Sequence, residues 1–116
     1  MRTMRALLLV LIVAGCDNPQ GNLGADGYRV ETQMFVRDAI ELKIVLYPSV
    51  AALNNEYGRT HRVPAGRELM AFSSLLPDGT GTCTIHAVDP RVSYHPEFLG
   101  HELTHCLLGE FHPHQP

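Results

Sequence analysis

The segment 96–109, PEFLGHELTHCLLG, has the clearest helical pattern in the sequence and constrains the fold more than any other stretch. Pro96 suits the first turn of a helix, where no backbone donor is needed, and Gly109 suits its end because glycine tolerates the left-handed conformation. At about 100° per residue, four apolar side chains gather on one side: Leu99, Leu103, Cys106 and Leu107. The helix must therefore bury that side against other elements of the fold.

His101 and His105 fall on the opposite side of this predicted helix. Because they are four residues apart, one ion can bridge both imidazoles. HELTH is also the HExxH pattern, in which two histidines hold zinc and the glutamate acts as a base on a zinc-bound water. A carboxylate placed this way can take a proton from the water and pass it to the leaving amine. The sequence thus predicts a metal site with Glu102 as its catalytic residue.

The stretch HELTHCLLGEFH resembles the zincin metallopeptidases and, within them, the extended metzincin signature HExxHxxGxxH. In that signature a glycine turns the chain so that a third histidine reaches the metal. The resemblance implies one zinc ion with His112 as third ligand, and Glu110 and His114 are alternatives. One residue more separates His105 from Gly109 than in the signature, and no methionine turn follows, so a compact, separate zincin branch is favoured.

Three protein ligands leave the fourth zinc position to water, as in catalytic sites, whereas a fourth protein ligand makes a site structural. His86 and His95 could supply that ligand. His86 lies mid-strand and is interpreted as a packed or solvated residue, and His95 as a helix cap or a support for the site. Tyr94 is interpreted as a packed residue, and polarisation of the scissile carbonyl is the alternative role for it. In zincins the strand before the active helix pairs with extended substrate, which implies this role for 82–89.

The rest of the chain predicts a small α+β domain. Four segments have strand composition: 28–36, 40–48, 68–76 and 82–89. The last two flank a Pro-Asp-Gly turn and indicate a hairpin. Ser49 can cap a short helix that ends at Gly58. We expect a short, mostly antiparallel sheet, one mid-chain helix and a metal-binding helix at the C-terminus, in a zincin-like arrangement.

The N-terminus has the pattern of an export signal. Arg2 and Arg5 precede an unbroken apolar run at 6–13, which is too short for a transmembrane helix. The following VAGC resembles the lipobox of bacterial lipoproteins, which implies cleavage before Cys16 and its lipidation. The alternative is an ordinary signal peptide or a short anchor that ends in a cysteine. Asp17 resembles the signal that keeps such lipoproteins in the inner membrane. The resemblance thus implies an envelope protein, lipid-anchored and facing the periplasm.

The expected organisation is a signal peptide at 1–15, a lipidated cysteine and flexible tether at 16–27, and a metallopeptidase domain at 28–116. A domain of this size is only marginally stabilised by a single core. With Cys16 lipidated, Cys83 and Cys106 remain as a pair, and a disulfide is expected in an oxidising compartment. The alternatives are two buried free thiols and a thiol ligand to the metal.

Removal of Arg2 and Arg5 leaves seven of the nine basic residues against all twelve acidic ones, a formal charge of −5. No Lys/Arg cluster remains, so nucleic acid and anionic headgroups are not expected partners. The predicted function is a membrane-anchored zinc peptidase acting on peptides or proteins. So small a domain supplies only half of a two-lobed cleft, and a protein partner could complete it. The alternatives are a lipoprotein binding module whose zinc site is structural or an inactive remnant, and a metal-carrying lipoprotein.

Overall fold

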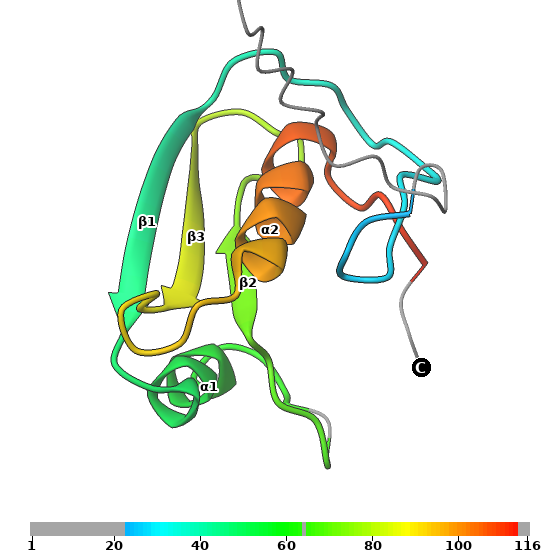
Figure 1. Ribbon diagram of the computed structural model, residues 1–116. Helices are drawn as coiled ribbons and strands as arrows, with labels where there is room; N and C mark the ends of the chain where they lie inside the picture. The colour runs from blue at the N-terminus through cyan, green and yellow to red at the C-terminus, as the bar shows by residue number, and fades with distance from the viewer. Residues whose placement is uncertain (1–22, 64, 114–116) are drawn as a thin grey trace, which may run out of the picture.

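The computed structural model describes residues 23–63 and 65–113 (Figure 1). The predicted signal peptide, Cys16, most of the tether and His114 lie outside these residues. Within the described part of the chain, no helix has both the length and the apolar character needed to cross a membrane.

Five elements follow one another along the chain: β1 (Glu41–Tyr47), α1 (Val50–Gly58), β2 (Ala71–Ser74), β3 (Thr82–Val88) and α2 (Pro96–Leu108). The strands form one sheet in the order β1-β3-β2. β2 and β3 are the predicted antiparallel hairpin, and β1 runs parallel to β3. The α+β class, the mid-chain helix and the C-terminal helix are confirmed, and the sheet is mixed.

The segment 28–36 is not a strand, which corrects the first predicted element. Together with the residues around it, it forms a strap, residues 24–37, that runs along the C-terminal end of α2 (Figure 1). The backbone N–H of Met34 donates to the carbonyl of Leu108 at 2.9 Å, and that of Arg37 to the carbonyl of Leu107 at 2.9 Å. These carbonyls belong to the last turn of the helix and have no partner within it. The strap therefore pairs with the helix end and takes no place in the sheet.

Local sequence accounts for the mid-chain helix. The Ser49 side chain caps α1 by accepting a hydrogen bond from the backbone N–H of Ala52 at 3.0 Å. Asn54 then ties the helix to the chain that leads into β2: its side chain donates to the carbonyl of Leu69 at 2.9 Å and accepts from the Leu69 N–H at 2.9 Å. α1 thereby fixes where the edge strand β2 begins.

The core lies between α2 and the sheet. Cys83 and Cys106 are fully buried and joined by a disulfide, as predicted. Ile85 completes the buried cluster, and Leu103 packs against it. The bond links the central strand to α2, and so it holds the helix that carries HELTH against the sheet.

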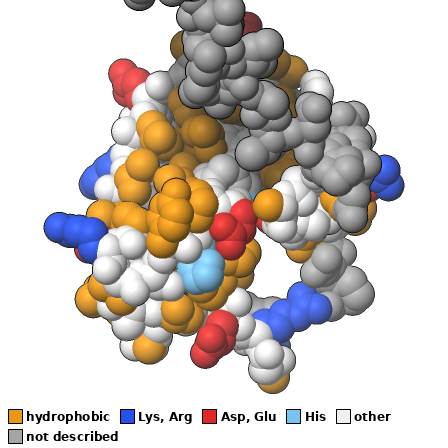
Figure 2. All heavy atoms as spheres, viewed as in Figure 1, with side chains coloured by type: hydrophobic (Ala, Val, Ile, Leu, Met, Phe, Trp, Pro, Cys, Tyr) orange, Lys and Arg blue, Asp and Glu red, His pale blue; other side chains and the backbone are white. Residues whose placement is uncertain are grey.

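An apolar groove opens between β1 and the start of α2. It has a volume of about 370 Å³. Leu42, Ile44 and Leu46 of β1 are each more than 40% exposed, because α2 covers β3 and β2 but not β1. Hydrophobic side chains gather on this face of the molecule, over β1 and the N-terminal end of α2 (Figure 2).

Candidate metal centre

α2 places His101 and His105 side by side. Pro96 occupies the first turn as expected, and the helix continues to Leu108, so the two histidines lie one turn apart on the same face. Their Nε2 atoms are 3.2 Å apart. The spacing of HELTH and the helix that carries it therefore bring two imidazole nitrogens to one point.

His112 reaches the same point because the helix ends at Gly109. This glycine has φ 74° and ψ −140°, a backbone conformation that L side chains rarely adopt. The reversal lets the chain fold back, and the Nε2 of His112 lies 3.0 Å from the Nε2 of His101. The ligand atoms of the three histidines all lie within 4.8 Å of one another. His112 was the predicted third ligand, and the structure brings it to the other two.

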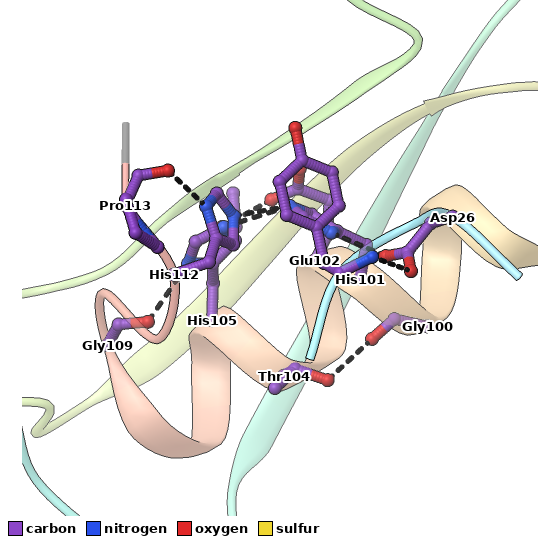
Figure 3. A network of polar contacts seen from close by, with 11 residues as sticks. Asp26, Gly100, His101, Glu102, Thr104, His105, Gly109, His112 and Pro113 are labelled. Atoms are coloured by element: carbon purple, nitrogen blue, oxygen red, sulfur yellow. Dashed lines mark hydrogen bonds and ion pairs between the residues drawn. The ribbon is translucent and has the colours of Figure 1, made fainter. Parts of the chain in front are cut away.

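The outer nitrogen of each imidazole meets an oxygen (Figure 3). The Nδ1 of His105 lies 2.9 Å from the carbonyl of Gly109, and that of His112 lies 3.0 Å from the carbonyl of Pro113. The Nδ1 of His101 lies 2.7 Å from a carboxylate oxygen of Asp26. Carbonyl and carboxylate oxygens only accept, so each Nδ1 carries the hydrogen. In the neutral imidazoles every Nε2 therefore presents a lone pair.

Three lone pairs that face one another repel, and one proton could bridge only one pair of them. A cation in the middle satisfies all three. Two nitrogens at about 2.0–2.1 Å from a tetrahedral ion lie about 3.3 Å apart, close to the 3.0 and 3.2 Å found between the Nε2 atoms of His101 and those of His112 and His105. Among the described residues, this histidine cluster could hold a metal ion.

Glu102 is buried, with 8% of its surface exposed, yet it lines the same cleft as the three histidines. One of its oxygens accepts a hydrogen bond of 2.7 Å from the hydroxyl of Ser73 on β2. A charged group taken out of water requires such a partner. The helix thus presents the carboxylate between the imidazoles and the sheet.

The cleft in front of the histidines has a volume of about 600 Å³ and runs along β2. The segment 82–89 was expected to pair with a substrate strand, and this prediction is wrong. It forms β3, which is the central strand and has neighbours on both sides. β2 is the edge strand on the cleft side. Leu69, Ala71, Phe72, Ser73 and Leu75, from β2 and its flanks, line the cleft. The edge available to an extended peptide is therefore that of β2.

Other predicted site residues lie elsewhere. Tyr94 and His95 line the apolar groove at the start of α2 and not the histidine cleft. His95 occupies the N-cap position but makes no side-chain cap, and its Nδ1 lies 3.2 Å from a carboxylate oxygen of Glu97. The ring of His86 stacks on the ring of Phe72. The Nδ1 of His86 lies 2.7 Å from the hydroxyl oxygen of Tyr47. Burial lowers the pKa of His86, as expected of a packed histidine.

Of the alternatives for the third ligand, Glu110 borders the cleft but is outside the histidine cluster, and His114 is outside the described residues.

The sequence did not indicate Asp26 or Ser73 as site residues. Asp26 lies in GADGY, which has the composition of a tether, and Ser73 is one of two serines in a short strand. Both reach the site from segments far from HELTH in the chain. Only an argument about which strand and which turn face α2 could have found them.

Compared with known protein families, with curated proteins and with solved structures, the chain matches none. The resemblance to zincins therefore depends on HELTHCLLGEFH and on the geometry that its residues adopt.

Proposed function

We propose that the protein is a zinc-dependent peptidase. The observation that carries the proposal is the convergence of three imidazole Nε2 atoms, each with its Nδ1 engaged by an oxygen, in a cleft that Glu102 also lines. Three nitrogen ligands with a carboxylate beside them are the donor set of a hydrolytic zinc site and leave a position for water.

Zinc is the ion that fits these ligands best, since it is commonly bound by three neutral imidazoles, and two of the three nitrogen pairs have a spacing close to that of a tetrahedral ion. When bound, it supplies a Lewis acid that polarises a carbonyl and lowers the pKa of water. His101, His105 and His112 would hold it. The hydrogen bonds from their Nδ1 atoms keep the three rings in the tautomer and orientation that binding needs.

Glu102 would move the proton. Its carboxylate would take a proton from the attacking water and then donate it to the leaving amine, as a general base and then a general acid. Ser73 donates to one carboxylate oxygen and leaves the other for this work. Because the group is buried beside the cleft, its interaction with a developing charge is not screened by bulk water.

An extended peptide would bind along the edge of β2. This edge offers backbone donors and acceptors, and peptide strands commonly add to such an edge. The cleft walls carry apolar side chains from both sides, including Phe35, Phe72 and Leu75. The substrate class that we propose is therefore an extended peptide or unfolded protein segment with apolar side chains near the cleaved bond.

The site of action that we propose is the bacterial cell envelope. The disulfide between Cys83 and Cys106 is the kind of bond that persists in oxidising compartments. Lipid on Cys16, with retention in the inner membrane through Asp17, would place the domain at the periplasmic face. A protein partner completing the cleft stays a prediction.

The experiment compares the full chain with two variants, Glu102→Gln and His112→Ala, for zinc content by elemental analysis and for cleavage of a synthetic peptide library. We expect one zinc per wild-type chain and cleavage, full zinc without cleavage in Glu102→Gln, and strongly reduced zinc in His112→Ala. Zinc without cleavage in the wild type would favour the binding module with a structural ion. A folded wild type that retains no zinc would refute the proposal.

A further inference from the structure

We propose that Asp26 is a positioning residue of the metal centre and that the strap, residues 24–37, is part of that centre. The inference depends on the proposed metal site and adds a residue to it. Asp26 lies 75 positions before His101 in the sequence, yet its Oδ2 is 2.7 Å from the Nδ1 of that histidine (Figure 3).

The contact is sheltered from solvent. The side chain of His101 is 13% exposed and that of Asp26 is 11% exposed. The hydrogen bond is charge-assisted because its acceptor is a carboxylate, and it is strong because little water competes for the two groups. A carboxylate behind a ligating imidazole fixes its tautomer and its ring plane, and makes the other nitrogen a better donor to a metal. Among the described residues, carbonyls lie behind His105 and His112, and Asp26 is the charged partner found behind His101.

A tight turn aims the carboxylate. Gly27 has φ 86°, and its N–H donates to the carbonyl of Gly24 at 3.0 Å, while the N–H of Gly24 donates to the carbonyl of Tyr28 at 2.7 Å. The second oxygen of Asp26 accepts from the N–H of Tyr28 at 3.1 Å. Both carboxylate oxygens are thus engaged, one by the turn and one by His101. GADGY is therefore an Asx-type turn that presents a carboxylate, and four of its residues, 24–27, belong to the segment predicted as the tether.

The residue after the turn also packs against the ligands. The ring of Tyr28 lies 4.2 Å from that of His112 and 4.8 Å from that of His101, measured between ring centroids. Farther along the strap, the N–H of Glu31 donates to the carbonyl of Phe111 at 2.8 Å. The strap thus contacts the first and third ligands and holds the backbone next to His112.

The test measures zinc affinity by competition with a chelator, on the full chain in detergent. Asp26→Ala removes the acceptor and should weaken zinc binding by about 10–100-fold. Asp26→Asn loses the charge and keeps one oxygen for the two donors that the carboxylate serves, the N–H of Tyr28 and His101. It should weaken zinc binding by roughly three- to tenfold. Asp38→Asn is the matched control, because Asp38 is an exposed carboxylate just beyond the strap, and it should leave the affinity unchanged.

A second measurement separates positioning from mere support of the fold. Nitrogen NMR of the metal-free protein reports which ring nitrogen of each histidine carries the hydrogen. His101 should carry it on Nδ1 in the wild type and should become a tautomer mixture in Asp26→Ala. His105, bonded to the carbonyl of Gly109, should not change.

The outcomes are distinguishable from those of the proposed function. If the wild type binds zinc and either Asp26 variant binds it within twofold of the wild type, the inference about Asp26 is overturned while the metal site stands. An unchanged His101 tautomer in Asp26→Ala would also overturn it. Should Asp26→Ala fail to fold, the affinity of Asp26→Asn decides alone. A folded wild type without zinc affinity overturns both proposals.

Discussion

Removing the disulfide between Cys83 and Cys106 should cost this domain a large part of its stability. The two cysteines are separated by 23 positions. In the chain-entropy model, a loop of that length lowers the entropy of the unfolded chain by about 11 cal/mol/K, or about 3.4 kcal/mol at 25 °C. A domain of this size has a total free energy of unfolding of only about 5–10 kcal/mol. The reduced protein should therefore keep a free energy of unfolding of only about 2–7 kcal/mol.

The assay is urea unfolding of the metal-free protein with and without a thiol reductant. For a slope of about 1 kcal/mol per molar urea, the midpoint should fall by about 3 M on reduction. The double variant Cys83→Ala/Cys106→Ala is the control: it should unfold near the midpoint of the reduced wild type and should not respond to reductant.

The reasoning would be refuted by a two-state transition in which reduction changes the free energy of unfolding by less than about 1 kcal/mol. Such a result would mean that packing around Ile85 holds α2 on the sheet without the covalent link. A fall of the expected size should be accompanied by weaker zinc binding, because the disulfide anchors the helix that carries two of the three histidines.

Three further changes test the site and its surroundings. Gly109→Ala should destabilise the protein by about 1–3 kcal/mol, because φ at Gly109 is 74° and an added Cβ would lie 2.9 Å from the Cβ of Met34. It should also lower the zinc affinity. Denaturant titration measures the first effect and zinc titration the second. Ser73→Ala should leave the zinc content unchanged and slow peptide cleavage by about tenfold or more, since Glu102 loses its donor; unchanged cleavage would contradict this. Burial holds the pKa of His86 below its usual 6.5, so the unfolded state binds more protons, and metal-free protein should lose stability as pH falls below that value. His86→Gln should reduce that pH dependence in denaturant titrations, and an unchanged slope would show that burial of His86 is not its source.

The sequence by itself determined the elements whose stability is local. The cap at Ser49, Pro96 in the first turn of α2 and Gly109 at its end were all readable from the chain, and each lies where it was predicted. The same holds for the pair of histidines in HELTH. These features depend on hydrogen bonds and side-chain contacts between residues at most four positions apart, so a short window contains the whole interaction.

The tertiary structure decided what depends on distant segments. The segments 28–36 and 40–48 have similar strand composition, yet only the second joins the sheet, because the first finds its hydrogen-bond partners at the end of α2. Strand order was equally open in the sequence, and it determines that β2 and not β3 offers its edge to the cleft. Alternating apolar residues bury equally well in several pairings, so the choice among them is made by the whole fold.

The candidate site also has a part that the sequence predicted and a part that only the tertiary structure decided. The positions of His101, His105 and Glu102 were predicted from the helical period of α2, and that of His112 from Gly109 at the end of the helix. Their partners Asp26 and Ser73 come from a turn and a strand that only folding brings to the helix. A helical period places side chains within one element, whereas the groups behind those side chains are contributed by whichever elements pack against it.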